Sequence, residues 1–165
     1  SDFITEALGA DVVLGEYQPG DGRSGEMEVF SPGEGGGTRV ARSLLLLRQL
    51  GPDDGWFVLA AVNEHTTIGA PQAGDSIAAG TVNVAGVARG FEANVVVRAV
   101  TAGTSEELDR AVTMGGAFEA SEPFTAALDL TAAEPGTTVM LLVRGGTGLE
   151  GDPGDFSAIP VVIAQ

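Results

Sequence analysis

Residues 81–100 have the sequence TVNVAGVARGFEANVVVRAV. Apolar side chains recur at every second position in residues 81–87 and again in residues 92–100. A period of two is typical of half-buried β-strands, since successive side chains point to opposite faces of a sheet. The stretch therefore predicts two successive strands and a β-rich fold.

Further short apolar runs follow toward the C-terminus, and we expect strands at 124–130, 138–143 and 158–163. Residues 104–114 (TSEELDRAVTM) are ambiguous. Thr104 with Glu107 three residues later matches a capping box, which would begin a helix, whereas a strand over 109–114 is slightly favoured. With a strand in 108–114, about seven strands fall within roughly 100 residues, the number in an immunoglobulin-like sandwich.

The N-terminal part also consists of short apolar runs separated by turn residues. We expect strands at 11–17 and 26–30. Residues 38–50 (TRVARSLLLLRQL) have helical spacing of apolar residues, but the turn Gly51-Pro52-Asp53-Asp54-Gly55 leads directly into the apolar run 56–62. Two apolar runs joined by such a turn favour a hairpin, so a strand is expected at 38–50.

These patterns predict an all-β chain with an immunoglobulin-like β-sandwich at residues 66–165 and a small N-terminal β-hairpin subdomain at residues 1–65. A unit of about 65 residues without a disulfide has a marginal core. We therefore expect the N-terminal unit to pack on the sandwich rather than to move freely.

The composition excludes several classes of function. The chain has 23 acidic residues, eight arginines, no lysine and a net charge of −15, which argues against binding to nucleic acid or to anionic lipid. It has no cysteine and one histidine, His65, so thiolate or histidine-rich metal sites and cysteine nucleophiles are excluded. No cofactor and no metal are expected.

No segment is long and apolar enough to cross a membrane, because even the longest uninterrupted apolar run, residues 56–62, is far shorter than the roughly 20 residues that a spanning helix needs. The chain begins Ser1-Asp2-Phe3 rather than with Met. We interpret this as a processed or trimmed chain from which a targeting segment or lipid anchor could have been removed.

Glycine-rich stretches produce two matches to the dinucleotide-binding pattern G-x-G-x-x-G, at 20–25 and 146–151. Neither is followed by a predicted helix, so both are interpreted as hairpin loops. His65 is predicted to be an exposed linker residue, because no G-x-S-x-G nucleophile elbow accompanies it. Trp56 and Phe57 are expected to anchor the core, with a partner-binding edge as the alternative.

Three carboxylates, Glu150, Asp152 and Asp155, fall within six residues of one loop. Carboxylates at this density could bind Ca²⁺, although the spacing does not match an EF-hand. A solvated acidic surface is the favoured interpretation, and the Ca²⁺ site is kept as a hypothesis.

Residues 86–98 (GVARGFEANVVVR) carry a family resemblance. Val84, Gly86 and Ala88 precede the pair Phe91-Glu92 as in the immunoglobulin-like domain associated with bacterial spore germination, which this sequence resembles over about residues 66–165. Shared features also include Pro71-x-x-Gly74, Pro123-Phe124 and Ile159-Pro160-Val161. The chain departs from the family at 101–108, where a longer stretch replaces a tight Asp-Gly turn. Residues 1–65 are similar to β-rich segments that precede this domain in some actinobacterial envelope lipoproteins.

The resemblance implies a non-catalytic, extracytoplasmic interaction module of a bacterial envelope or secreted protein. Its partner would be a protein or another component of the cell envelope, and a carbohydrate or cell-wall ligand is the alternative. Phe91, Glu92 and Asn94 are the motif residues carried over. We expect Phe91 to plug the core at a strand start and Glu92 to cap loop N–H groups.

Overall fold

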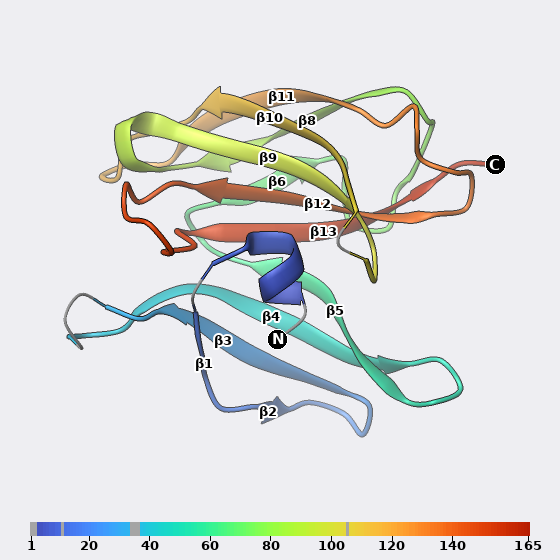
Figure 1. Cartoon of the computed structure of the whole chain (residues 1–165), viewed down its shortest axis with the longest axis horizontal. Coiled ribbons are helices and arrows are strands. Elements are labelled where there is room, and N and C mark those ends of the chain that lie inside the picture. Colours follow the sequence, from blue (N-terminus) through green and yellow to red (C-terminus); the bar gives the residue numbers. More distant parts are fainter. Residues whose placement is uncertain (1–2, 11, 34–36, 105) are drawn as a thin grey trace.

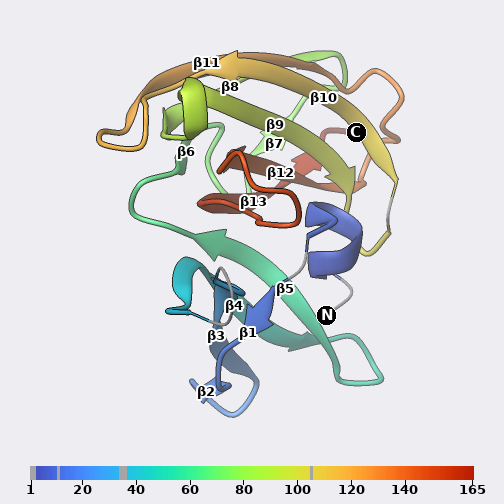
Figure 2. The same ribbon diagram turned by 60° about the vertical axis from the view of Figure 1, so that its left-hand side comes forward.

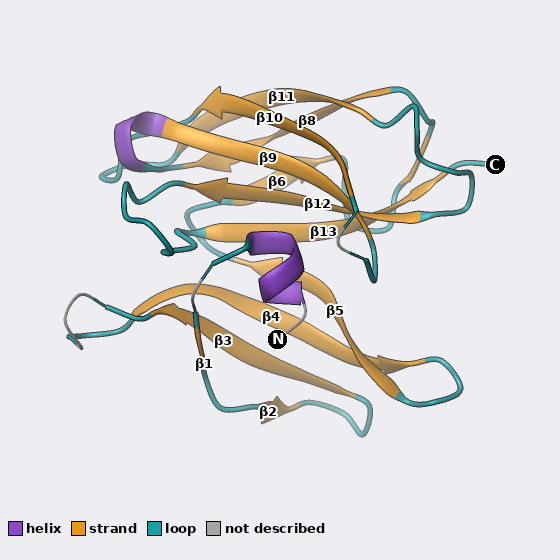
Figure 3. Cartoon of the chain, in the orientation of Figure 1, coloured by secondary structure: helices purple, strands orange, loops and turns teal. Residues whose placement is uncertain are grey.

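Two β-sheets form the computed structural model of the chain, which describes residues 3–10, 12–33, 37–104 and 106–165 (Figure 1). The strands are antiparallel except where β7 pairs with β13. The larger sheet has the order β1-β3-β4-β5-β13-β12-β9-β10, with β2 beside β3 and β7 beside β13; the smaller has the order β11-β8-β6. Two short helical turns, η1 (Ile4–Leu8) and η3 (Phe91–Ala93), complete the described elements (Figure 3).

The strand bounds follow the apolar runs of the sequence closely. Those of the larger sheet are β1 (Val13–Leu14), β2 (Gln18–Pro19), β3 (Ser24–Ser31), β4 (Val40–Leu50), β5 (Gly55–Val62), β7 (Ser76–Ile77), β9 (Asn94–Thr101), β10 (Glu107–Met114), β12 (Thr138–Gly145) and β13 (Phe156–Ile163). Those of the smaller sheet are β6 (Thr67–Ala70), β8 (Thr81–Ala88) and β11 (Glu122–Asp129). The expected all-β, immunoglobulin-like sandwich with an N-terminal hairpin unit packed on it is confirmed.

The main core lies between the two sheets of the sandwich. Side chains at alternate positions of facing strands fill it, including Val84 in β8, Val97 in β9, Leu128 in β11 and Leu141 in β12. All four are fully buried. The alternation that the sequence showed in residues 81–100 therefore directs one side of each strand into this core.

A second core covers the opposite face of β12 and β13. Met140 and Leu142 of β12, with Phe156 and Ala158 of β13, pack against the N-terminal strands and η1. Leu45 of β4 is among the N-terminal residues of this cluster. Figures 1 and 2 show the layer of β3, β4 and β5 lying across this face of the sandwich. The N-terminal unit thus buries a surface that the sandwich could not bury by itself.

Asn63 fixes the chain where it passes from the hairpin unit to the sandwich. Its side-chain amide donates to the carbonyl of Arg42 in β4, at 2.8 Å. Its side-chain oxygen accepts from the N–H groups of His65 and Thr66, at 2.8 and 3.0 Å. Its own N–H donates to the hydroxyl of Ser157 in β13, at 3.1 Å. These bonds tie both units to one turn, next to the single Ala61–Ala158 pair that joins β5 to β13.

A largely buried ion cluster joins the two units as well. Arg42 of β4 donates to Asp152 at 2.8 Å and to Asp155 at 3.4 Å, both in the loop before β13. Arg89, after β8, donates to the other oxygen of Asp155 at 3.0 Å. Burying these charges is tolerated because each carboxylate faces a guanidinium.

Several ambiguous segments are now resolved. The strand expected at 38–50 is confirmed as β4, and residues 51–55 form the turn to β5. The strand expected at 109–114 is confirmed as β10, which begins at Glu107. The capping-box interpretation is wrong, because the Thr104 hydroxyl donates to the carbonyl of Thr101 and accepts from the N–H of Glu106 in a turn. The glycine-rich match at 146–151 lies in the loop between β12 and β13, as expected, whereas the match at 20–25 covers the turn after β2 and runs into the start of β3.

Other expectations need correction. The single strand predicted at 11–17 is wrong over its described part, since only Val13–Leu14 pair before the ladder breaks and resumes at Gln18–Pro19. Tyr17 lies in the break with its ring over Gly25 of β3, where a Cβ atom would come within 2.2 Å of the ring. The sandwich part contains eight strands, β6–β13, rather than about seven. No helix among the described residues has the length and apolar character needed to cross a membrane.

Replacing Arg42 by methionine tests the ion cluster. The Arg42→Met variant leaves the Asp152 carboxylate buried without its guanidinium, so we expect a loss of about 3–5 kcal/mol in the free energy of unfolding, measured by urea denaturation. Arg48→Met is the matched control, because Arg48 is an exposed arginine of the same strand. Equal losses in the two variants would show that the cluster does not hold the units together.

Candidate functional site

Three loops meet at one end of the sandwich and are bonded to each other through their backbones. They are residues 89–93 between β8 and β9, 115–121 between β10 and β11, and 146–155 between β12 and β13. Gly90 N donates to Gly116 O at 2.9 Å, Gly115 N to Ala93 O at 2.9 Å, and Phe91 N to Gly146 O at 2.7 Å. Such cross-loop bonds hold the three loops in one arrangement.

Two glycines permit this close approach of backbones. A Cβ atom at Gly145 would lie 1.7 Å from the carbonyl oxygen of Arg89 in the 89–93 loop, and one at Gly90 would lie 3.0 Å from the backbone nitrogen of Gly146 in the 146–155 loop. No other residue could occupy either position without moving a neighbouring loop.

Each loop presents an exposed apolar side chain that is followed immediately by an exposed glutamate. We call these six residues the three-loop surface; they are Phe91-Glu92, Phe118-Glu119 and Leu149-Glu150. The rings of Phe91 and Phe118 lie 6.3 Å apart between centroids and are tilted by 49°. Phe91 also lies over Gly148, where a Cβ atom would be 2.9 Å from the ring. The result is an apolar patch with carboxylates beside it.

The roles expected for the family motif change accordingly. Phe91 does not plug the core, because 46% of its surface is exposed. Phe91–Ala93 form the turn η3, and Glu92 and Ala93 have φ of 53° and 60°, so the strand begins only at Asn94. Within the described part of the chain, the Glu92 side chain makes no hydrogen bond to a loop N–H. Asn94 is exposed at the start of β9, and its carbonyl accepts from Gly146 N at 3.2 Å.

Left-handed backbone at non-glycine residues is energetically costly. Two such residues in succession at Glu92 and Ala93 require support from their surroundings, which the cross-loop bonds supply. Strain of this kind concentrates at binding and active sites, so its position beside Phe91 makes the three-loop surface a candidate site.

The acidic loop divides its three carboxylates between two environments. Asp152 and Asp155 are directed at Arg42 and Arg89, whereas Glu150 is exposed on the three-loop surface. Among the described residues, no three or more His, Asp or Glu side chains are grouped so as to hold a metal ion. A Ca²⁺ ion here would compete with two guanidinium groups for the same carboxylates. The Ca²⁺ site stays a prediction that calorimetry with millimolar CaCl₂ tests.

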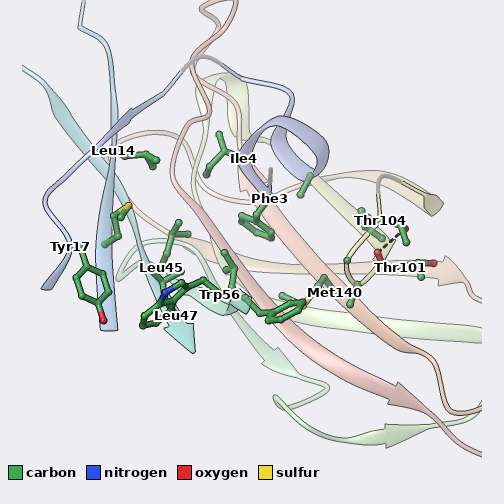
Figure 4. A pocket seen from close by; sticks show the side chains of 17 residues that line it. Phe3, Ile4, Leu14, Tyr17, Leu45, Leu47, Trp56, Thr101, Thr104 and Met140 are labelled. Carbon is green, nitrogen blue, oxygen red and sulfur yellow. Dashed lines mark hydrogen bonds between the residues drawn. The ribbon is translucent and has the colours of Figure 1, made fainter. Parts of the chain in front are cut away.

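A second candidate is an apolar cleft of about 590 Å³ between the N-terminal unit and the sandwich (Figure 4). Among the described residues its lining contains no charged side chain, and comes from η1, the strands β3, β4 and β5, the turn 101–104 and Met140 of β12. Trp56 and Phe57 lie here rather than in the core, so the expected core-anchoring role is wrong. Trp56 packs edge-on against Tyr17, with centroids 5.4 Å apart and an interplanar angle of 71°.

Two arginines of the sandwich fasten η1 over the cleft. Arg98 of β9 donates to the carbonyl of Ala7, and Arg144 of β12 donates to that of Leu8 at 3.1 Å. Free carbonyls at the end of a helical turn attract cations. Burial lowers the pKa of Arg144 from its ordinary value, and the nearby charges of Arg98 and Arg110 add to this.

Residues 65–144, 80 of the 165 in the chain, match the family model of the immunoglobulin-like domain of bacterial spore germination. The chain carries a domain of this family. No curated protein and no solved structure matches the chain. The germination-associated domain includes Phe91 and Phe118, whereas Leu149 and most of the cleft lining lie outside the matched residues.

Part of this site was visible in the sequence. The family resemblance indicates the pair Phe91-Glu92 and the acidic loop includes Glu150, whereas no motif in the sequence indicates Phe118, Glu119 or Leu149. In each of the three predicted loops an apolar residue is followed by glutamate. This repetition is the sequence signal that could have identified the three pairs as one site. Only the strand order shows that these loops lie at the same end of the germination-associated domain.

His65, the single histidine, is half-buried at the junction of the two units, rather than exposed as expected. Its Nε2 lies 3.0 Å from Glu64 Oε1. Within the described residues, no serine hydroxyl bonds to its ring, and the hydroxyl of Ser121 donates instead to the His65 backbone carbonyl at 2.7 Å. A Ser-His-acid arrangement is therefore not assembled around it.

Glu107→Gln tests the charge network behind the cleft. Burial alone would raise the pKa of Glu107, but hydrogen bonds from Arg110 and Arg98 outweigh it and lower the pKa below 4.5. The ionised carboxylate therefore stabilises the fold above pH 4.5, and this contribution is lost as pH falls through the lower, folded-state pKa. We expect the variant to be less stable than the wild type at about pH 7 and the difference to shrink at about pH 3.

Urea denaturation at both pH values measures the effect. Glu26→Gln is the control, because Glu26 is an exposed glutamate of β3 without an ion pair in the described structure. A difference between Glu107→Gln and the wild type that stays constant with pH would contradict the proposed charge contribution.

Proposed function

We propose that this germination-associated domain is a non-catalytic, extracytoplasmic module that binds a protein partner of the cell envelope through the three-loop surface. The observation that carries the proposal is the set of three exposed apolar side chains, Phe91, Phe118 and Leu149, held together on bonded loops. Exposed aromatic side chains are typical anchors of protein interfaces. Loops on a rigid sandwich are the usual place for such anchors.

The charge of the surface indicates the chemistry of the partner. Glu92, Glu119 and Glu150 are all exposed beside the apolar anchors, and the nearby Arg89 is already paired with Asp155. A complementary partner would present apolar side chains flanked by lysine or arginine. The net charge of −15 would further accelerate the association of a basic partner.

The side chains that line the cleft and those around His65 support a non-catalytic role. Within the described lining of the cleft there is no titratable acid or base besides Tyr17, whose hydroxyl donates to the Ser24 carbonyl at 2.9 Å. The only histidine has no nucleophile at its ring among the described residues. The extracytoplasmic location rests on the family of the domain.

We further propose that residues 1–65 are a subdomain and residues 66–165 the sandwich. The start of the family match at residue 65 supports this boundary. Because the buried cluster of Arg42, Asp152 and Asp155 crosses the boundary, the two parts are expected to unfold together.

A carbohydrate or cell-wall ligand is the second candidate. Paired aromatic rings with neighbouring carboxylates, here Phe91 and Phe118 with Glu92 and Glu119, could stack on a sugar ring and accept its hydroxyl hydrogens. Binding of a neutral glycan would be nearly independent of salt, whereas binding of a basic peptide would weaken as salt screens the charges.

The test is nuclear magnetic resonance mapping with short synthetic peptides that contain Phe or Leu between Arg residues. We expect shifts of the amide resonances in 89–93, 115–121 and 146–151, and binding that weakens with added salt. Phe91→Ala should lower the affinity about tenfold or more, because truncation of a central anchor typically costs about 2 kcal/mol or more.

Phe57→Ala is the matched control, because Phe57 is also 46% exposed but lines the cleft. It should leave peptide binding unchanged. Equal loss in both variants, or shifts outside the three loops, would contradict the proposed interface. Shifts with peptidoglycan fragments and none with the peptides would favour the second candidate.

A further inference from the structure

The apolar cleft has the size and enclosure of a small-molecule site. Its volume of about 590 Å³ lies within the range of about 300–1,000 Å³ usual for ligand pockets. Phe3, Ile4 and Ala7 of η1 line one side, and the N-terminal strands and Met140 line the others. Pockets at the interface of two structural units are common binding sites.

The polar atoms of the cleft leave little for a polar ligand to bind. The hydroxyl of Tyr17 donates to the carbonyl of Ser24 at 2.9 Å. The hydroxyl of Thr101 donates to Glu106 at 3.2 Å, and that of Thr104 donates to the carbonyl of Thr101 at 3.0 Å. These three hydroxyl donors are used inside the protein, which leaves the indole N–H of Trp56 as the remaining side-chain donor of the described lining. A sugar or carboxylate placed here would lose more hydrogen bonds to water than one indole N–H replaces.

The negative net charge of the protein argues against an anionic ligand. None of the described lining residues carries a charge, and the chain as a whole carries −15. An anion would therefore meet no cation in the cleft and would be repelled by the protein.

The shape of the cleft favours an extended ligand. Figure 4 shows Leu14 and Tyr17 on one side and Thr101 and Thr104 on the opposite side, with Leu47 and Trp56 between them. The floor includes Met140, whose flexible thioether adapts to irregular apolar shapes.

We propose that this cleft binds an uncharged, linear alkyl chain, which lies between η1 and strands β4 and β5. The site is separate from the three-loop surface. Strand β9 begins at the three loops with Asn94 and ends at the cleft with Thr101, so the two sites are about 20 Å apart. One site can therefore be altered without changing the other.

The protein contains its own reporter for this site. Trp56 is the only tryptophan in the chain, lines the cleft and is 48% exposed. Titration with 1-decanol should give a saturable blue shift of its fluorescence as water leaves the indole ring. Affinity should rise about fourfold per methylene from 1-hexanol to 1-decanol, as expected for burial of each methylene. Decanoate should bind at least tenfold more weakly than 1-decanol.

Substitutions test whether 1-decanol binds in the cleft rather than on another apolar surface of the protein. Phe57→Ala should weaken 1-decanol binding about fivefold, and Leu47→Glu should abolish it by placing a carboxylate in the cleft. Tyr17→Phe should leave binding unchanged, because the hydroxyl that it removes bonds within the protein. Phe91→Ala is the matched control for Phe57→Ala, with the same loss of a 46% exposed ring at the other site.

Circular dichroism of each variant shows whether it is folded, and Phe57→Ala decides the outcome if Leu47→Glu does not fold. The proposal is overturned by a titration that does not saturate, by tighter binding of decanoate or maltose than of 1-decanol, or by equal effects of Phe57→Ala and Phe91→Ala. None of these results depends on whether the three-loop surface binds a peptide.

Discussion

Strands β12 and β13 are buried on both faces, and the arrangement of the other elements follows from this. Leu141 and Val143 of β12 face the sandwich core, while Met140 and Leu142 face the opposite way. If the sandwich were alone, the second set would be exposed to water, at a cost of about 1.5–3 kcal/mol for each large side chain. The N-terminal strands and η1 remove that cost by covering this face. Neither unit is therefore complete without the other.

Polar contacts fix how the covering layer is placed, since apolar contacts alone are not directional. The Asn63 side chain sets the turn between the units, and Arg42 reaches across to Asp152 and Asp155. On the other side, Arg98 and Arg144 bind the carbonyl end of η1. The few cations of this acidic protein are thus used largely to position its parts.

This arrangement leaves the two candidate binding surfaces at opposite ends of β9. The three-loop surface belongs to the sandwich itself, where bonded backbones hold Phe91 and Phe118 in an exposed position. The cleft exists only because the N-terminal unit packs on the sandwich. One surface is apolar with carboxylates beside it, and the other is apolar without charge. The two surfaces therefore suit partners of different chemistry.

The sequence by itself determined the elements that depend on local pattern. Alternation and turn residues placed most strands, including β4, where the turn at 51–55 outweighed helical spacing. The absence of cysteine and the net charge limited the chemistry, and the pair Phe91-Glu92 indicated both the family and part of the site. What only the tertiary structure decided is where those residues face. Phe91 and Trp56 look like core residues in a linear pattern, yet both are exposed, because exposure depends on which distant segments cover a strand and not on its own spacing.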